Sequence, residues 1–179
     1  MKCKNCKNRI LKKVVEIGKQ PLSGFFYSSK MNKLKKYSLN LYKCSKCNLV
    51  QLNNLVDIKK MYGKHYGHQT SVSKMMILHL KEKIHRLKKI NLIHKGSQIL
   101  DIGSNDASFL KLFGNGYNLN GIDPSAKKFK KNYKGMNLTT DFFSRNNVLK
   151  KHKDKNIKFD LISSFAIFYD VENPNLFCQ

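Results

Sequence analysis

The sequence predicts an α/β fold in which a small cysteine-containing module precedes an incomplete Rossmann-like domain. Three observations lead to this prediction. Cysteines occur as two closely spaced pairs in the N-terminal third of the chain. After Gly96, short apolar segments alternate with polar segments of helical length, which is typical of a parallel sheet with helices on both faces. The chain of 179 residues ends just past the fourth apolar segment, before such a sheet is complete. The predicted domain ranges are 1–55 for the module, 56–95 for a connector and helix, and 96–179 for the truncated sheet domain.

The composition is strongly basic, with 35 Lys and Arg against 11 Asp and Glu and a formal net charge of +24. A basic surface attracts polyanions, of which nucleic acid is the most common. The cations are nearly all lysines spread along the chain, however, whereas base and phosphate recognition favours the planar fork of arginine. We therefore interpret the charge as a generally solvated surface, and we do not expect nucleic acid to be a dedicated partner.

The N-terminus shows no targeting segment. It reads Met-Lys-Cys-Lys-Asn-Cys, with no apolar stretch of a secretory signal behind it, and no apolar run in the chain is long enough to span a bilayer. The sequence thus predicts a cytoplasmic protein without a membrane partner, in a compartment where disulfides are disfavoured.

Four of the five cysteines form two Cys-x-x-Cys pairs, Cys3 with Cys6 and Cys44 with Cys47, while Cys178 stands alone. In a reducing compartment two such pairs are typical of zinc. Two tight turns can place four thiolates around Zn²⁺ in a tetrahedron, and the absence of an open coordination position makes the predicted zinc structural. The alternative is a set of reduced core cysteines, but lysines surround both pairs and make the segments too polar for a core.

Within the module, 37–42 and 49–52 alternate as strands do. The connector 56–72 is rich in Tyr, Gly and His and predicts a loop, which either carries function or packs on the next domain. Ser73 begins a predicted helix that ends near Gly96, with one apolar stripe at three- and four-residue spacing. The residues of this stripe are Met76, Ile77, Leu80, Ile84 and Leu87.

The domain after Gly96 is predicted to alternate between strands and helices. The predicted strands are 98–102, 119–122, 138–140 and 159–165. The predicted helices are 108–113, 125–132 and 144–152.

The first strand of this domain leads into the segment Ile-Gly-Ser-Asn-Asp-Ala, residues 102–107. Gly103 allows a ligand to approach the backbone closely, and the helix that follows offers amide donors, as in the nucleotide crevice of doubly wound sheets. The chain has neither Gly-Lys-Ser/Thr nor a complete Gly-x-Gly-x-x-Gly, so nucleoside triphosphates and dinucleotides fit poorly. The predicted ligand contains ribose and adenine but no pyrophosphate.

Two further acidic positions follow predicted strands. Asp123 lies 20 residues after Gly103, the offset at which a carboxylate binds ribose hydroxyls. Its alternative role is a turn or helix cap before Pro124. Asp141 and Phe142 follow the third strand and could bind the adenine amino group and stack on the base; otherwise they are a capping residue and a core phenylalanine.

Taken in order along the chain, several stretches resemble the nucleotide-sugar C-methyltransferases that carry an N-terminal zinc-binding domain. The stretches are Cys3-Lys-Asn-Cys6, Gln20-Pro-Leu22, residues 42–52, residues 66–71 with Met76 and His79-Leu80, residues 102–106, residues 121–125, and Phe168-Tyr-Asp170.

The resemblance implies a class I methyltransferase that uses S-adenosylmethionine to methylate a nucleotide-linked keto-deoxysugar. A base removes the proton next to the ketone, and the enolate carbon then attacks the sulfonium methyl group. It also implies that Tyr66 and Ser71 line the substrate pocket near that methyl group. The four paired cysteines would hold zinc. The expected cofactor-binding residues are Asp101, Gly103, Ser104, Asn105, Asp106, Asp123, Pro124, Asp141 and Phe142.

Two departures from the family pattern affect these expectations. Ala107 stands where the family has Gly, which would tighten the loop. The chain also stops at Gln179, whereas family members continue through the rest of the sheet and a C-terminal domain that carries much of the sugar site. We therefore expect the missing half in a longer chain and no turnover by this chain alone. No catalytic base is predicted, because His65, His68 and His79 each fit a solvated or packing role better.

Two other functions are compatible with parts of the sequence. A zinc-containing RNA methyltransferase would explain the charge, but the chain has no arginine-rich patch and no catalytic motif of the Asn-Pro-Pro-Tyr kind. A non-catalytic zinc-ribbon module that binds nucleic acid would leave Gly103 and Asp123 unexplained.

Overall fold

The computed structural model describes residues 1–24, 34–52, 56–63, 66–152 and 154–179. The chain divides into two compact units. Unit 1 contains residues 1–67 together with 168–179, and unit 2 contains residues 68–167. The return of residues 168–179 to unit 1 has no signal in the sequence, and the domain ranges given above stay predictions.

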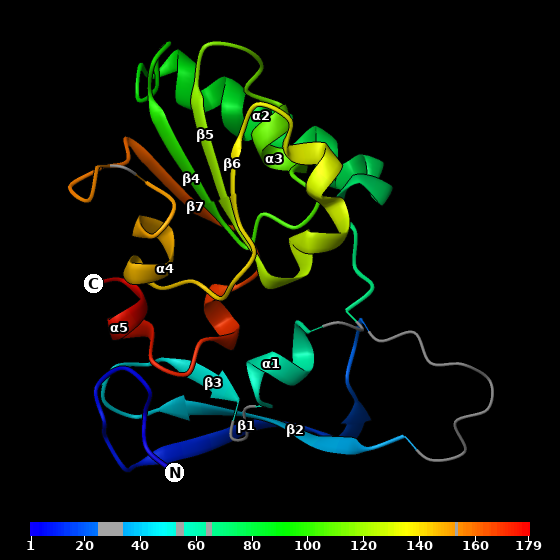
Figure 1. The fold of residues 1–179 in the computed structure, drawn as a ribbon. Coiled ribbons are helices and arrows are strands. Elements are labelled where there is room, and N and C mark those ends of the chain that lie inside the picture. Colours follow the sequence, from blue (N-terminus) through cyan, green and yellow to red (C-terminus); the bar gives the residue numbers. More distant parts are fainter. Residues whose placement is uncertain (25–33, 53–55, 64–65, 153) are drawn as a thin grey trace. The chain divides into compact units, whose positions relative to one another are not determined.

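Unit 1 is built on a three-stranded antiparallel sheet in the order β1-β2-β3 (Figure 1). β2 (Lys36–Cys44) and β3 (Val50–Leu52) cover the two segments that alternate in the sequence. β1 (Leu11–Pro21) was not predicted, because irregularities at Lys13/Val15 and at Glu16/Lys19 shift its pairing with β2 and break the alternation.

Short helical turns complete unit 1. α1 (Ile58–Met61) lies within the predicted connector and is capped by the carboxylate of Asp57, which accepts from the amide of Lys59. At the C-terminal end, the 3-10 turn η3 (Phe168–Asp170) is followed by α5 (Pro174–Phe177).

Unit 2 has a parallel four-stranded sheet in the order β6-β5-β4-β7 (Figure 1). These strands are β4 (Gln98–Ile102), β5 (Asn118–Ile122), β6 (Asn137–Thr139) and β7 (Leu161–Ser164). In sequence order this is 3-2-1-4, the arrangement of the first half of a Rossmann sheet, and the order reverses between β4 and β7. The predicted α/β architecture with a parallel sheet is therefore confirmed.

Helices cover both faces of this sheet. α2 (Lys74–Lys89) and α3 (Ser108–Lys111) lie on one side and α4 (Arg145–Leu149) on the other (Figure 1). Leu80 and Ile84 of the predicted α2 stripe are buried in the core, together with residues of α3, β4 and β5. The N-terminal end of the stripe is less covered than predicted, since Met76 is 40% exposed.

The helix predicted at 125–132 takes a different form. Pro124–Tyr133 (η2) is a 3-10 segment interrupted at Phe129, whose φ of −108° and ψ of 18° are not helical. Another 3-10 turn, Thr70–Val72 (η1), precedes α2. The described residues contain no helix that combines the length and the apolar character needed to cross a membrane.

Gly121 in β5 has no room for a side chain, because Ser104 and Tyr133 pack directly over it. A Cβ atom there would lie 2.6 Å from Ser104 Oγ and 2.7 Å from Tyr133 Cε1. We expect Gly121→Ala to lower the free energy of unfolding in urea by about 1–3 kcal/mol, the usual cost of overpacking. The double variant with Ser104→Ala removes the nearest oxygen and should recover part of that loss. Equal stability of Gly121→Ala and wild type would contradict this packing.

Candidate functional site

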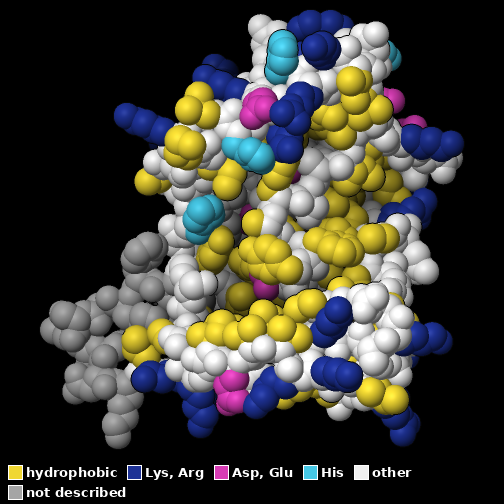
Figure 2. All heavy atoms as spheres, turned by 180° about the vertical axis from the view of Figure 1, so that it is seen from behind, with side chains coloured by type: hydrophobic (Ala, Val, Ile, Leu, Met, Phe, Trp, Pro, Cys, Tyr) yellow, Lys and Arg dark blue, Asp and Glu magenta, His cyan; other side chains and the backbone are white. Residues whose placement is uncertain are grey.

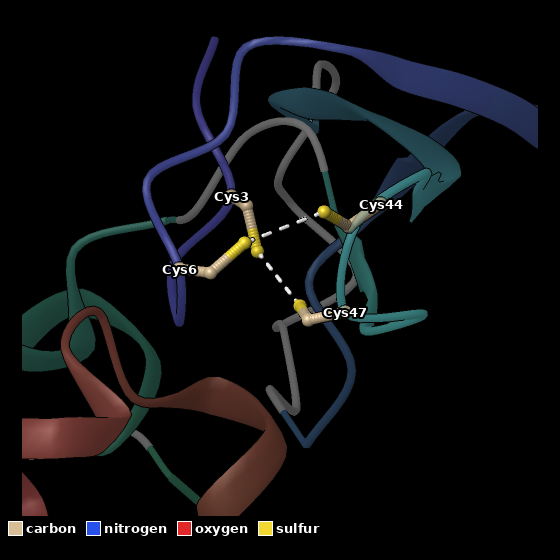
Figure 3. A group of neighbouring side chains, drawn as sticks. All are labelled: Cys3, Cys6, Cys44 and Cys47. Carbon is tan, nitrogen blue, oxygen red and sulfur yellow. Dashed lines mark hydrogen bonds between the residues drawn. The ribbon is translucent and has the colours of Figure 1, made fainter.

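The structure brings all four predicted metal ligands together (Figure 3). Their sulfur atoms lie within 4.8 Å of one another, with 3.5 Å between Cys3 and Cys47 and 3.6 Å between Cys6 and Cys44. A tetrahedron of Zn–S bonds of ~2.3 Å places its sulfurs about 3.8 Å apart, so the cluster fits Zn²⁺ with little adjustment. Each cysteine is a free thiol, as metal binding requires.

Each Cys-x-x-Cys pair lies in a turn with the same backbone pattern. The amide of Cys3 donates to the oxygen of Asn8 at 2.8 Å, and the amide of Lys7 donates back to the oxygen of Cys3 at 3.0 Å. In the second turn the amide of Asn48 donates to the oxygen of Cys44 at 3.1 Å. Lys7 and Asn48 both have φ near +60°, the left-handed conformation that closes a tight turn. We call these turns the first and second knuckles.

Backbone amides in the knuckles point at sulfur and change its acidity. The amides of Cys47 and Lys46 lower the pKa of Cys44 to about 6, although burial opposes this shift. The amide of Asn8 lowers the pKa of Cys6, but burial and the neighbouring thiols raise it overall to about 11. Four thiolates this close repel one another, so full ionisation requires a cation such as Zn²⁺ between them.

Gln51 connects the first knuckle to β3, a role that the sequence did not indicate. Its side chain is buried, accepts from the amide of Lys4 at 2.8 Å and donates to the oxygen of Lys2 at 3.1 Å. The side-chain amide therefore satisfies two backbone groups of the knuckle at once, as a neighbouring strand would.

In unit 2 the loop after β4 has an unusual backbone. Gly103, Asn105 and Ala107 have φ values of +76°, +46° and +64°. A side chain at Gly103 would meet Ile167 at 2.6 Å. Ala107 precedes α3 and lies in the left-handed region without the conformational freedom of glycine, and the tighter loop expected at this position stays a prediction.

Hydrogen bonds hold this loop from the side of η2. The amide of Asn105 donates to Asp123 at 2.9 Å. Tyr133 donates its hydroxyl to the oxygen of Asn105 at 2.9 Å and lies 2.8 Å from the hydroxyl of Ser104. The loop is thus shaped before any ligand binds.

The segment before α2 holds the loop from the other side. The side chain of Asn105 donates to the oxygen of His68 at 3.1 Å and accepts from the amide of Thr70 at 3.0 Å. The carboxylate of Asp106 accepts from the amide of Ser71 at 2.9 Å. Ser71, predicted near the substrate, therefore lies beside the predicted cofactor loop, while the side chains of Asn105 and Asp106 are occupied by these contacts.

Asp123 caps η2, the alternative that the sequence left open. Its Oδ1 accepts from both the amide and the hydroxyl of Ser125 at 2.6 Å, and its Oδ2 accepts from Asn105. Pro124 occupies the first turn of η2. Since each carboxylate oxygen has two acceptor positions, Oδ2 keeps one for a further donor such as a ribose hydroxyl. The capping and ribose-binding roles are compatible.

Asp141 and Phe142 follow β6, beside the end of β5 that carries Asp123. Asp141 is exposed and accepts from the amide of Phe142 at 2.7 Å. Asn147 of α4 donates to the oxygen of Phe142 at 3.0 Å. The carboxylate remains open to a ligand, and its adenine role stays a prediction.

The other predicted positions are less informative. Tyr66 belongs to unit 1 and packs edge-on against Tyr62, with ring centroids 5.0 Å apart. His68 and His79 are exposed, and His65 lies outside the described residues.

The structure adds a pair that the sequence did not reveal: Tyr62 donates its hydroxyl to the buried carboxylate of Asp170. Burial raises the pKa of Asp170 despite this bond.

Asp101 is buried in the centre of the sheet, between Gly121 of β5 and Ser163 of β7. Its carboxylate accepts from the hydroxyl of Ser163 at 2.7 Å. Burial raises the pKa of Asp101 to about 7; Ser163 lowers it, and the charge of Asp123 raises it further. Near neutral pH this carboxyl can therefore exchange a proton inside the fold.

We expect one zinc per chain in purified protein, measured by elemental analysis. Cys44→Ser should lower both the zinc content and the thermal stability, because it removes a buried ligand. Cys178→Ser is the matched control, since this exposed thiol lies outside the cluster and should change neither. Undiminished zinc in Cys44→Ser would refute the four-ligand assignment.

Asp101 should also make stability depend on pH. An unfolded Asp titrates near pH 3.9, so between about pH 4 and 7 the folded chain binds more protons than the unfolded one. The stability from protonated Asp101 is present below pH 4 and is lost as pH rises toward 7. Asp101→Asn keeps an acceptor for Ser163 but has no proton to lose. Its free energy of unfolding should therefore exceed that of wild type by up to about 4 kcal/mol at pH 8, but not at pH 4.

The same denaturant series with Asp154→Asn serves as the control, because Asp154 is exposed and accepts from the amide of Asn156. That variant should follow wild type at both pH values. An Asp101→Asn variant with the pH dependence of wild type would contradict the assignment of the buried proton to Asp101.

Comparison with known protein families finds a likeness in the part of the chain that contains the cysteine cluster. A methyltransferase-associated family model described as "Putative zinc binding domain" matches residues 3–62, a range that includes all four clustered cysteines. No curated protein matches the chain significantly. The match ends before the parallel sheet begins. The N-terminal part of the chain is therefore similar to a methyltransferase-associated domain described as a putative zinc-binding domain, and the four clustered cysteines lie within the matched range.

Proposed function

We propose that the chain is the N-terminal part of a methyltransferase in which unit 2 binds S-adenosylmethionine. The observation that carries this proposal is the preformed loop 103–107 at the carboxyl end of β4, with Asp123 at the end of the neighbouring strand. Ligands of open α/β sheets bind at this edge, where the strand order reverses. The part of the chain that precedes the sheet is similar to a methyltransferase-associated putative zinc-binding domain, which supports the proposal.

The charge of the loop region supports a cationic cofactor over a phosphate ligand. Asp101, Asp106 and Asp123 lie close enough together that their charges all raise the pKa of Tyr133, although burial is the largest cause of that shift. Three carboxylates repel phosphate groups, whereas the sulfonium and ammonium groups of S-adenosylmethionine outweigh its one carboxylate, and it carries no phosphate. The buried acids therefore complement this cofactor.

In this proposal the chain's own residues bind and orient the cofactor. Asp123 accepts from the ribose through the free position on Oδ2, Asp141 and Phe142 contact the adenine, and residues 103–106 contact the methionine end. The bound cofactor supplies an electrophilic methyl group. Because hydrogen bonds from both sides fix the loop, the binding free energy is not spent on ordering it.

For the acceptor we propose the carbon next to the ketone of a nucleotide-linked keto-deoxysugar, on the strength of the resemblance described above. Transfer to such a carbon requires a base that removes its proton and donors that stabilise the enolate oxygen. Tyr66 and Ser71 are the proposed pocket residues. We assign no base among the described residues.

RNA is the alternative acceptor, and one observation favours it. Lys127, Lys128, Lys130 and Lys131 of η2 are exposed, and residues 124–140 contain no Asp or Glu. On the face that Figure 2 shows, however, Lys and Arg side chains are scattered rather than gathered in one patch. A dedicated RNA surface would bind tightly at moderate salt, whereas scattered lysines lose affinity steeply as salt rises.

The cofactor proposal is tested by calorimetric titration of the full chain with S-adenosylmethionine. Asp123→Asn replaces one acceptor oxygen by a donor and should weaken binding about tenfold or more, since hydrogen bonds to charged groups contribute about 1.5–3 kcal/mol. Asp160→Asn is the matched control: Asp160 accepts from the amide of Gln98 at the opposite end of β4 and should leave affinity unchanged. Equal affinities of wild type and Asp123→Asn would contradict the ribose role.

A further inference from the structure

The C-terminal residues 168–177 lie against the first knuckle of the metal centre. The ammonium group of Lys4 donates to the oxygen of Val171 at 3.4 Å, and the side-chain amide of Asn175 donates to the oxygen of Asn5 at 3.1 Å. Lys4 and Asn5 are the two residues between the ligands Cys3 and Cys6. Segments at opposite ends of the chain therefore meet on the turn that the metal holds.

A second anchor fixes the same segment from α1. Tyr62, directly after α1, donates its hydroxyl to the carboxylate of Asp170. Asp170 is buried and is also attracted by the charge of Lys4. The segment is thus held at Asp170, Val171 and Asn175.

The first knuckle depends on the metal for its shape. It is a polar turn of Lys and Asn, closed by a left-handed residue at Lys7, and Cys3 is the buried apolar side chain that it contributes. The side chain of Gln51 connects the first knuckle to β3 through two hydrogen bonds. These bonds involve backbone groups of Lys2 and Lys4. The side-chain amide of Asn8 donates to the hydroxyl of Ser45 in the second knuckle at 3.0 Å, and bonds from Cys3 and Cys6 to a shared ion would fix the residues between these two ligands.

We propose that the metal centre acts as a latch for residues 168–177. With metal bound, the first knuckle presents the ammonium group of Lys4 and the oxygen of Asn5 in positions that hold this segment. When the metal leaves, the knuckle loses its shape, and the segment detaches from it. This inference does not depend on methyl transfer or on the identity of the cofactor.

The latch has a consequence for the surface of unit 1, because the segment forms one wall of an apolar groove of about 600 Å³. The opposite wall comes from the face of the sheet. The residues of the segment wall are Phe168, Tyr169, Val171 and Pro174, and those of the sheet wall include Leu39, Leu41, Val50 and Leu52. Metal loss should therefore open the groove as well as release the segment.

Hydrogen–deuterium exchange of the full chain, with mass spectrometric detection, tests the latch. Chelation of the metal should raise exchange in peptides covering 168–177 at least tenfold, since each lost hydrogen bond of about 0.5–1.5 kcal/mol changes the closed population about twofold to tenfold. Peptides of β4, β5 and β7 should keep their protection and serve as the internal control. Unchanged exchange of 168–177 after complete metal removal would overturn the proposal.

Variants of the metal-loaded chain separate the latch from general loss of structure. Asn175→Ala and Lys4→Met each remove one contact and should raise exchange in 168–177 about twofold to tenfold, while zinc stays at one per chain. Lys46→Met is the matched control, because this exposed lysine lies in the second knuckle. Protection in Asn175→Ala equal to that of wild type would also count against the latch, because this residue is remote in sequence from every ligand.

Discussion

Unit 1 depends on its metal centre because it has almost no apolar interior. Among its described residues, the fully buried apolar side chains are those of Cys3 and Cys44, whereas Val14, Val15 and Ile17 of β1 are 40–53% exposed. A three-stranded sheet with so little buried surface is marginal in water. Bonds from four thiolates to zinc contribute on the order of 10 kcal/mol in small zinc-binding peptides, far more than the hydrogen bonds of Gln51. The two knuckles and their metal therefore stabilise unit 1 in place of an apolar core. The segments that contact the knuckles depend on the metal for the same reason.

Unit 2 is stabilised by a different interaction, the burial of a continuous apolar core between α2, α3 and the sheet. Ile99 and Leu110 are fully buried there, and Ala107 of the loop after β4 is part of the same cluster. Gly121 allows Ser104 and Tyr133 to pack against β5, so the loop rests on the core rather than extending from it. The packing of the core therefore also holds the loop in its conformation. This packing explains how an alanine in the left-handed conformation is tolerated at position 107.

Local patterns predicted much of this architecture. Cys-x-x-Cys spacing identified the ligands because two thiolates of one tight turn are necessarily neighbours, and the short apolar runs identified β4 and β5 because a parallel sheet buries both faces. Features that depend on distant pairing had no such signal. β1 was missed because its irregular pairing breaks the two-residue period. No local pattern distinguished the 3-10 form of η2, whose Tyr133 contacts the loop, from an α-helix.

The same limit applies to the candidate sites. The spacing of Asp123 from Gly103 favoured a ribose ligand over a cap. The structure shows that Asp123 caps η2, and that this cap leaves an acceptor position free on Oδ2. No local pattern could reveal that Tyr62 meets Asp170, because those residues lie 108 positions apart. Nor could the sequence show that Asn105 binds the backbone of His68 and Thr70. Such contacts form between segments that are far apart in the sequence and meet only in the folded chain.

The acidic residues of this chain are more informative than its many lysines. An exposed lysine costs little free energy, so 35 cationic residues can accumulate without any role in recognition. A buried carboxylate is costly unless hydrogen bonds or a nearby charge compensate it. Of only 11 acidic residues, Asp101, Asp106 and Asp123 are each less than 9% exposed and lie together at the carboxyl ends of β4 and β5. Backbone amides and hydroxyls compensate Asp106 and Asp123, but Asp101 has mainly Ser163, and burial keeps its pKa raised. A cation bound at this edge would relieve that cost, which is a physical reason to expect a positively charged ligand there even though the protein as a whole is strongly basic.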